Sequence, residues 1–494
     1  MIEQQQKLGL SPYGDLYEII VPKDNLLRQL KDLVDFTFVY QEVVRNYTLD
    51  NGRAAKDPIR MFKYLLLKVI YDLSDVRVVE RSLYDLSFKY FLDMVPEEST
   101  LIDPSTLTYF RKLRLKDVKL MHLLLSKTIE IAKEKGIKFG KNIIVDATHT
   151  IARSINTNPK EALMKRVKAL EKSLRCSGDE IGISVPKTPD MNDVSQMLTF
   201  CKDMLEFAKS QEVLMLLPDV KEKAELLTEA IDETEERFAV SKDKDARTGY
   251  KTPTQPFFGT KEHIAIDEES GLVTAVVVTS GEAHDGKQLG ALVQQSRENG
   301  MEVEGVIADK AYAGTPNQEL AAKSKDEGGD FKLYAQMQKE EVGHSEDDGF
   351  VFNKDAGMMV CPAGHMAIGR QHRKARHDKK RSRNESFTYR FNVEICKNCP
   401  LRDGCYNGTK TKNYTISIPP ELNVKHREFE KTNEFRQKLR LRYKIEAKNS
   451  DLKNNYGLDR ATSYGLENMT MQTALSVFAC NLKRIIRLTK AKNE

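Results

Sequence analysis

The chain lacks tryptophan, has few cysteines and contains no long hydrophobic run. Because a membrane-spanning helix needs about 18 or more consecutive apolar residues, no transmembrane segment is expected. Residues 1–20 do not show the order of basic, apolar and small residues that marks a signal peptide, so export is not indicated. Seven cysteines in 494 residues are too few for a disulfide scaffold, and their odd number fits a reducing compartment. The sequence therefore predicts a soluble, cytoplasmic protein.

The chain also lacks a strong overall charge, since its net charge is only +5, so the placement of the basic residues matters more than their number. They concentrate in three stretches of the C-terminal half, at 370–383, 425–444 and 483–492. Such stretches are most often solvated faces, but three of them favour a polyanionic partner, with nucleic acid as the first choice. The length predicts about three folding units.

Residues 1–125 are predicted to form a helical domain. Helices are expected to start at Asp57-Pro58 and at Asp103-Pro104, because aspartate caps a helix and proline suits its first position. The second helix would present basic and hydroxyl side chains to DNA, as helix-turn-helix proteins do. These side chains are Thr106, Arg111, Lys112 and Arg114. An ordinary helical bundle explains the same pattern equally well.

Short β-branched runs follow, and two of them stop at an aspartate. Residues 142–146 are predicted to form a buried strand that ends at Asp146, and a second strand ends at Asp309. Between them, residues 264–266 and 272–279 are expected to form a hairpin. This order predicts a mixed sheet in an α+β or α/β fold. If the two strands are neighbours, both carboxylates face one crevice, where Mg²⁺ or Mn²⁺ would balance their charges. Either aspartate taken alone more often caps a loop.

A third acid lies in a predicted helix near the C-terminus. At about 100° per residue, Arg442, Glu446 and Lys453 share one face of that helix. A surface ion pair between Arg442 and Glu446 would explain the same spacing without a catalytic role.

Together these residues resemble bacterial insertion-sequence transposases of the DDE class, whose catalytic core is similar to ribonuclease H. In that family the first aspartate stands in a D-[AGS]-T motif, as Asp146 does here, and the second stands in D-K-[GA]-Y, as Asp309 does. The third acid belongs to a helical Tyr-x2-Arg-x3-Glu-x6-Lys motif, in which Leu439 replaces the tyrosine. The segments "NGRAAKDPIRMFKYLLLKVIY" and "FACNLKRIIRL" also look like family features.

The resemblance implies an enzyme that uses Mg²⁺ or Mn²⁺ to cleave transposon ends and to transfer them into target DNA. The implied catalytic residues and metal ligands are Asp146, Asp309 and Glu446. The implied contacts to DNA or phosphate are Thr148, Lys310, Tyr312, Arg442 and Lys453. The implied partners are double-stranded DNA, namely the terminal inverted repeats and the target, and a second copy of the chain bound to that DNA. The implied location is the bacterial cytoplasm, and the nucleoid when the protein is bound to DNA. The alternatives are a domesticated protein that binds DNA without cutting it, and another Mg²⁺-dependent ribonuclease H-like nuclease.

The resemblance also divides the chain. Residues 140–155 and 240–325 would form the ribonuclease H-like core, and 425–494 would add helices that complete it. Residues 156–239 are expected to be a helical insertion. Residues 326–424 would be a basic, cysteine-containing insertion, because the chain between Asp309 and Glu446 is much longer than such a core needs.

Four cysteines of that second insertion have the spacing of a metal site. Cys361, Cys396, Cys399 and Cys405 include a close C-x2-C pair, with proline and glycine at the turns, which suits tetrahedral Zn²⁺. An Fe–S cluster and unliganded reduced thiols are the alternatives. The isolated Cys176, Cys201 and Cys480 are expected to be buried or inert.

Polar residues next to these motifs are weaker candidates. Thr148 and His149 follow the first acid, and His284-Asp285 follows the hairpin, so contacts to DNA or metal are conceivable. Capping of the next helix by Asp285 is the simpler expectation.

Overall fold

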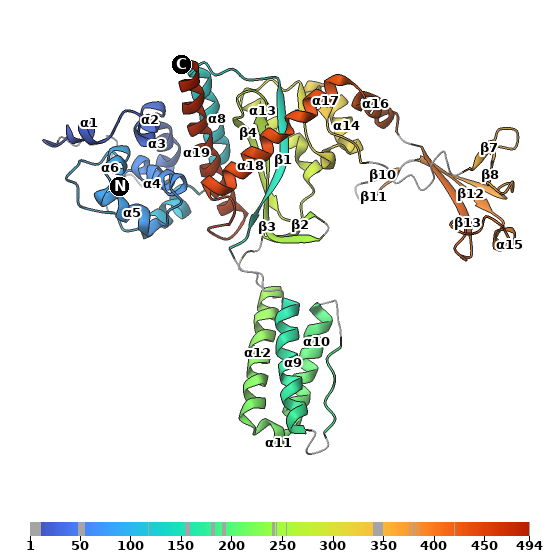
Figure 1. The fold of residues 1–494 in the computed structure, drawn as a ribbon. Coiled ribbons are helices and arrows are strands. Elements are labelled where there is room, and N and C mark those ends of the chain that lie inside the picture. The colour runs from blue at the N-terminus through green and yellow to red at the C-terminus, as the bar shows by residue number, and fades with distance from the viewer. Residues whose placement is uncertain are drawn as a thin grey trace.

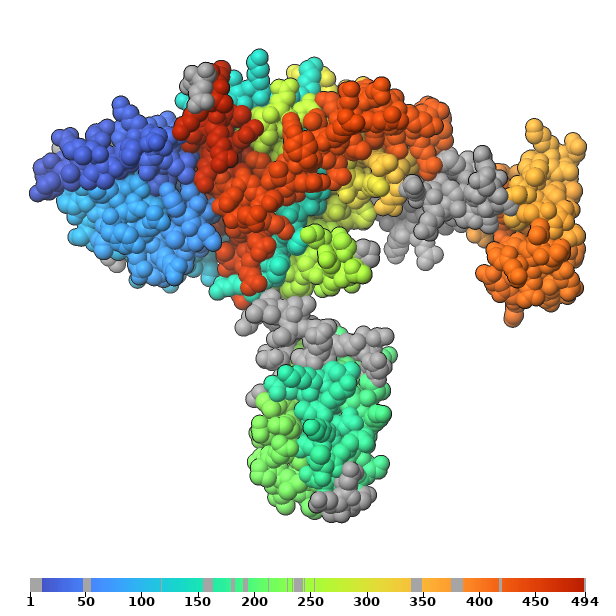
Figure 2. Space-filling model, viewed as in Figure 1, coloured from blue at the N-terminus to red at the C-terminus, as the bar shows by residue number. Residues whose placement is uncertain are grey.

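The computed structural model describes residues 11–47, 55–116, 118–153, 159–178, 183–189, 194–239, 243, 245–252, 254–338, 349–374, 376–378, 381–383, 385–418 and 420–493. A main body contains the N-terminal helices, the central sheet and the C-terminal helices (Figure 1). A helical bundle projects from one end of the sheet, and a small β module lies beyond the other side. Figure 2 shows both as separate masses beside the main body.

The N-terminal part is helical, as predicted. Its elements are α1 (Leu16–Ile20), α2 (Leu26–Leu33), α3 (Thr37–Val43), η1 (Val44–Asn46), α4 (Pro58–Ile70), α5 (Asp75–Tyr84), α6 (Leu86–Phe91), α7 (Ser105–Tyr109), a π-helical turn η2 (Phe110–Arg114) and α8 (Leu120–Glu134). Both expected starts are present. The Asp57 side chain accepts a hydrogen bond from the Ile59 amide, and Asp103 accepts one from the Ser105 amide.

The central sheet is mixed, with helices on both faces. Its strands are β1 (Asn142–Ile151), β2 (Arg247–Thr252), β3 (Gln255–Asp267), β4 (Val273–Ser280), β5 (Gly305–Ile307) and β6 (Lys332–Tyr334). Their order is β2-β3-β1-β5-β6, and β4 pairs with β3. The long strand β3 is antiparallel to β1, β2 and β4, whereas β5 is parallel to both β1 and β6. The predicted hairpin is therefore present as β3 and β4.

The first strand is longer than predicted. It was expected to end at Asp146, but β1 continues to Ile151. The reason is that β3 pairs with β1 along residues 143–151, whereas the parallel neighbour β5 pairs only with residues 142–144. Asp146 therefore lies in the middle of β1, just beyond the point where its β5 neighbour stops.

The two faces of the sheet contribute to two separate cores. Ile144, Ile264 and Ile307 belong to the larger core, which also includes side chains of α4 and α8 and of the C-terminal helix α19 (Leu466–Asn493). Ile143 and Val306 belong to the smaller core, together with α13 (Leu289–Glu298). The connections on that side are η4 (Asp285–Gln288), η5 (Lys310–Tyr312), α14 (Thr315–Ala322) and η6 (Lys325–Glu327). The 28-residue α19 contacts α2, α4, α8 and β4, and so joins the N-terminal helices to the sheet.

The predicted helix with the third acid begins after a short irregular stretch. Three elements precede it: α16 (Glu421–Glu430), α17 (Asn433–Leu439) and the 3-10 turn η8 (Arg440–Arg442). Helix α18 then runs from Tyr443 to Tyr456. Ile445 and Leu452 of α18 are buried, so the apolar stripe of this helix packs against the body.

The bundle and the β module have their own small cores. The bundle contains α9 (Pro159–Gly178), α10 (Val194–Ser210), α11 (Glu212–Met215) and α12 (Pro218–Ala239), and it buries Cys201, whereas Cys176 is exposed. The module contains β7 (Val351–Asn353), β8 (Met358–Val360), β9 (Gly369–Arg373), β10 (Arg376–Asp378), β11 (Arg381–Arg383), β12 (Glu385–Phe391), α15 (Val393–Lys397) and β13 (Lys412–Ile418). Of the basic stretch 370–383, Lys379 and Lys380 lie outside the described residues. Among the described helices, none combines the length and the apolarity that a bilayer crossing requires.

Candidate active site

Asp146 and Asp309 follow the same pair of aligned residues on two neighbouring parallel strands. Ile144 of β1 pairs with Ile307 of β5, and each aspartate follows two residues later. Asp146 is still in β1, while Asp309 begins the turn η5, where its side chain accepts a hydrogen bond of 2.5 Å from the Ala311 amide. Because alternate residues of a strand share a face, Asp146 points to the same side as Ile144, toward α18. The structure thus brings the first two predicted acids to one edge of the sheet.

The electrostatics of Asp146 reflect this proximity. Its pKa is raised from 3.8 to about 6, chiefly by burial and to a smaller extent by the nearby negative charges of Asp309 and Asp285. The Ala147 amide and the Arg442 guanidinium act in the opposite direction. A buried carboxylate next to two further negative charges forms a site that favours a cation.

Helix α18 reaches Asp146 through a residue that the sequence did not reveal. The amide Nδ2 of Asn449 donates a 3.1 Å hydrogen bond to Oδ2 of Asp146. Asn449 is buried, and its own Oδ1 has no hydrogen-bond partner among the described residues. This arrangement fixes the Asp146 carboxylate and leaves a buried oxygen beside it.

Glu446 lies one turn before Asn449 on the same helix, but it is oriented toward solvent. Its side chain is 62% exposed and stands 3.8 Å from the Arg442 guanidinium. No hydrogen bond or ion pair joins Glu446 to Asp146 or Asp309 in the described part of the chain. The ion pair between Arg442 and Glu446, which was the alternative to a catalytic role, is therefore present.

Lys453 lies near Glu262 of β3, a buried acid that the sequence pattern did not indicate. Glu262 is fully buried, accepts hydrogen bonds from Thr150 (2.8 Å) and Thr260 (2.9 Å), and has its pKa raised to about 7 by burial. Lys453 is half-buried, and burial lowers its pKa although Asp459 and Glu262 oppose this. It has no hydrogen-bond or ion-pair partner among the described residues, so its ammonium is available to an anion.

The remaining predicted contacts divide into exposed and buried side chains. Lys310 is exposed, at the start of η5. Thr148 and Tyr312 were expected to contact DNA, but Thr148 is buried and Tyr312 is only 1% exposed. The Tyr312 hydroxyl is buried and has no hydrogen-bond partner among the described residues. Its pKa is raised well above 10, mainly by burial and then by the negative charges of Asp285, Asp146 and Asp309. Tyr312 therefore packs beneath the acids.

The polar residues after the hairpin have exchanged their expected roles. His284, not Asp285, caps η4, because its Nδ1 accepts a hydrogen bond from the Gly286 amide. Asp285 instead accepts a 2.8 Å hydrogen bond from Lys261. His149 stacks against Phe257 at 4.5 Å, and burial together with the charges of Lys453 and Lys251 lowers its pKa to about 4.

Two of the basic side chains expected to face DNA are used within the N-terminal helices. Arg111 pairs with Asp75, which Lys68 also contacts at 2.8 Å. Arg114 donates to the Asn46 carbonyl and lies over the Tyr47 ring. Lys112 alone is exposed and unpaired among these described side chains. The cause is local packing, because the π-helical turn η2 directs Arg111 and Arg114 back toward the body.

The four cysteines of the β module converge on one small cavity of about 60 Å³, which His365 also lines. All four are free thiols. Burial raises the pKa of Cys396, and the sulfurs of Cys405, Cys361 and Cys399 raise it further, so the four groups are close neighbours. The His365 amide donates to the Cys361 sulfur at 3.4 Å. Converging thiols with an amide directed at sulfur are the donor set that suits Zn²⁺.

At neither candidate centre do the described side chains already stand at the positions that metal ligands require. Across the described ranges, no group of three or more His, Cys, Asp or Glu side chains is arranged to hold a metal ion. The donor chemistry nevertheless fits, since Asp146 and Asp309 offer hard oxygen ligands beside an unpartnered buried Asn449 oxygen, and the cysteines offer sulfur.

Two parts of the chain match transposase family models. Residues 15–113 match the family model "Transposase domain (DUF772)", and residues 360–486 match the model "Transposase DDE domain". The second match includes the four cysteines, Glu446 and Lys453, but it does not extend to Asp146 or Asp309. A search of curated proteins finds no significant match. Among solved structures, the chain is similar to a piggyBac transposase in a synaptic complex with hairpin DNA, with a TM-score of 0.31, 9% identity, and coverage of 94% of this chain and 74% of that one. The predicted resemblance to DDE-class transposases is confirmed by the two family matches.

Proposed function

We propose that this chain is a DDE-class transposase that cleaves the ends of its own mobile element and joins them to target DNA. The two family matches support this proposal, one to a transposase domain at residues 15–113 and one to a transposase DDE domain at residues 360–486. The observation that carries this proposal is that Asp146 and Asp309 each follow by two residues a pair of aligned positions on the parallel strands β1 and β5, with Asp146 bonded to α18. Both steps are phosphoryl transfers, so one site can perform cleavage and joining.

We further propose that the sheet is a ribonuclease H-like core. Three strands, β1, β3 and β4, are consecutive antiparallel neighbours, and β5 and β6 extend the other edge in parallel. In this division, residues 140–155 and 240–325 form the core and 425–494 complete it. Residues 156–239 and 326–424 are insertions, and 1–125 form a DNA-binding helical domain.

In the proposed reaction, Asp146, Asp309 and Glu446 hold Mg²⁺ or Mn²⁺. When bound, the metal would activate an attacking water or 3′-hydroxyl and stabilise the leaving oxygen. Asn449 keeps the Asp146 carboxylate in one orientation through its 3.1 Å hydrogen bond. Glu446 must turn from Arg442 toward the aspartates, and its exposure leaves it free to do so.

The cations around the acids would bind the DNA backbone. Once Glu446 turns inward, the Arg442 guanidinium is released to a phosphate, with its buried Nε as an unused donor. Lys453 and Lys310 lack partners among the described residues and can neutralise neighbouring phosphates. We propose that Thr148 and Tyr312 act only as buried support for this site. Two copies of the chain would hold two transposon ends together.

The cysteine cluster is proposed to bind a structural Zn²⁺ that fixes α15 to β8 and the turns around them. The basic strand β9 of the same module would then provide a rigid surface beside the DNA.

The proposal is tested with DNA that carries the inverted sequences flanking the gene. We expect Mg²⁺-dependent 3′-end cleavage and strand joining by the intact protein, and loss of both in Asp146→Asn, Asp309→Asn and Glu446→Gln. Glu304→Gln is the matched control, since Glu304 is an exposed acid at the opposite end of β5. Cleavage that persists in the three variants rejects the site. Cutting without joining or end preference indicates a nuclease, and binding without cutting indicates a domesticated DNA-binding protein.

A further inference from the structure

We propose that a cleft between the N-terminal helices and the α18–α19 connection binds the sugar-phosphate backbone of duplex DNA beside the cleavage site. This inference rests on the proposed function and adds the path of the DNA. The cleft has a volume of about 1060 Å³. One wall comes from α4, α5 and the α7–η2 segment, and the other from the end of α18, residues 457–464 and the start of α19.

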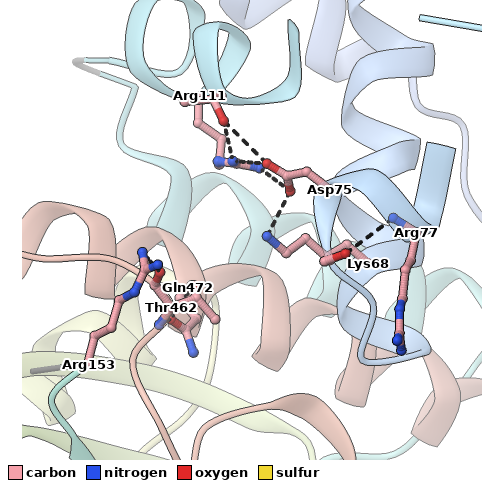
Figure 3. A network of polar contacts seen from close by, with 9 residues as sticks. Lys68, Asp75, Arg77, Arg111, Arg153, Thr462 and Gln472 are labelled. Atoms are coloured by element: carbon pink, nitrogen blue, oxygen red, sulfur yellow. Dashed lines mark hydrogen bonds and ion pairs between the residues drawn. The ribbon is translucent and has the colours of Figure 1, made fainter. Parts of the chain in front are cut away.

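The N-terminal wall is held rigid by an ion-pair network. Asp75 pairs with both Lys68 and Arg111, and Thr108 donates a 3.3 Å hydrogen bond to the same carboxylate. Figure 3 shows this network on one side of the cleft. The network neutralises Asp75, and its fixed geometry leaves Lys112, the next residue along η2, exposed at the rim.

The opposite wall is a loop, residues 457–464, that is fastened by one glutamine. Nε2 of Gln472 donates to the carbonyls of Gly457 (2.7 Å) and Arg460 (3.0 Å), and its Oε1 accepts from the amide and hydroxyl of Thr462 (both 2.9 Å). Arg153 donates a 3.0 Å hydrogen bond to the Thr462 carbonyl. Figure 3 shows Arg153, Thr462 and Gln472 grouped across from the Asp75 network. A loop held at several points can present cations without the entropy cost of ordering it.

The charge of the cleft favours a polyanion. Six cationic side chains line it: Lys68, Arg111, Lys112, Arg153, Lys453 and Arg460. The acids that line it are Asp72, Asp75 and Asp459, of which Asp75 is already paired. The side chains of Lys112, Lys453 and Arg460 have no hydrogen-bond or ion-pair partner among the described residues. Backbone amides and carbonyls of the fastened loop bond to Gln472, to Ile151 of β1 and to the Arg153 side chain, so the cationic side chains are the groups left to contact DNA. Such charges contact phosphates and not bases.

The cleft is continuous with the catalytic edge through β1. Ile151, the last residue of β1, forms a parallel bridge with Arg460, and its amide bonds to the Asp459 carbonyl at 3.0 Å. Asp146 lies five residues earlier on the same strand. At about 3.3 Å per residue this is about 17 Å, or about five base pairs of duplex at 3.4 Å each. Arg460 would therefore contact the backbone about five base pairs from the cleaved phosphate.

Two variants that each remove one positive charge test the cleft, Lys112→Ala and Arg460→Ala. Arg77→Ala removes one positive charge elsewhere and serves as the control. Arg77 is an exposed arginine on α5 that does not line the cleft, and Figure 3 shows it on the far side of the Asp75 network. The full chain is titrated against a labelled duplex without Mg²⁺ over a range of salt concentrations, with thermal unfolding as the check that each variant is folded. We expect Lys112→Ala and Arg460→Ala each to weaken binding on any sequence and to lower the slope of log K against log salt by about 1. Arg77→Ala should keep the intact slope.

The outcome is independent of catalysis, so it separates the cleft from the proposed function. Unchanged slopes in both cleft variants, with folded protein, overturn the cleft even if transposition is observed. An equal loss in Arg77→Ala also overturns it, because that result reports general positive charge. As a second readout, amine acetylation followed by mass spectrometry should show Lys112 protected by duplex DNA and Lys141, which is exposed at the other end of β1, unprotected. Failure of cleavage with intact slopes would overturn only the transposase chemistry.

Discussion

The buried acid Glu262 makes the stability of the central sheet depend on pH. It has no exposed surface, and its two hydrogen bonds come from hydroxyl groups, not from cations. Burial raises its pKa from 4.5 to about 7, so the folded protein holds a proton that the unfolded chain has already lost. The contribution of this group is therefore most favourable below pH 4.5, and it is lost as the pH rises through about 7.

The magnitude follows from the pKa shift. Each pKa unit corresponds to 1.36 kcal/mol, so a shift from 4.5 to about 7 corresponds to about 3 kcal/mol of stability lost between acid and alkaline pH. Replacing the acid by its neutral isostere, Glu262→Gln, removes this loss. We expect the variant to be more stable than the intact chain by about 3 kcal/mol at pH 8 and to show little difference near pH 4.5.

The measurement is amide hydrogen exchange of peptides from β1 and β3, corrected for the intrinsic effect of pH, with urea unfolding followed by circular dichroism as a global readout. Glu304→Gln is the matched control, because Glu304 is exposed and its charge stays in water. The reasoning is refuted if Glu262→Gln and the intact chain lose stability in parallel as the pH rises.

Three further predictions concern other parts of the molecule. Asn449→Ala should lower kcat for strand joining about 10- to 100-fold with little change in KM for DNA, because it removes the hydrogen bond to Asp146. Ser450→Ala, at an exposed position of α18 outside the cleft, should leave kcat unchanged, and equal rates in both variants would remove Asn449 from the site. Asp75→Asn should destabilise the fold by about 2 kcal/mol at neutral pH. The reason is that burial alone would raise the Asp75 pKa, whereas hydrogen bonds from Arg111 and Lys68 lower it to about 2. In urea titrations, the difference in stability between the variant and the intact chain should disappear as the pH falls from about 4 to 2. Elemental analysis should find about one zinc per chain, lost in Cys399→Ser but kept in Cys176→Ser, and zinc-free intact protein would contradict the cysteine centre.

The sequence was sufficient where the signal is local. Capping aspartates next to proline located the starts of two N-terminal helices, and β-branched runs located β1, the β3–β4 hairpin and β5. The prediction that Asp146 and Asp309 lie on one edge of the sheet depended on two apolar runs, which form strands that are parallel to each other.

The sequence was insufficient where a side chain depends on a distant partner. The end of β1 was placed too early because the apolar run stops at Asp146, whereas β1 continues past it and Thr150 bonds to Glu262 and to the Leu458 carbonyl. Arg111 looked free for DNA because Asp75 lies far earlier in the chain. Asn449 was missed for the same reason, since helical periodicity identifies a polar position but not that it faces Asp146.

The placement of α19 has a consequence for synthesis on the ribosome. Leu27 and Leu30, near the beginning of the chain, share one continuous core with Leu482 and Ile485, near its end. A nascent polypeptide therefore cannot close this core until the residues of α19 have been translated. Truncated products would expose a wide apolar surface and carry no assembled nuclease, so an interrupted gene would yield degradable fragments and not a partially active DNA-cutting protein.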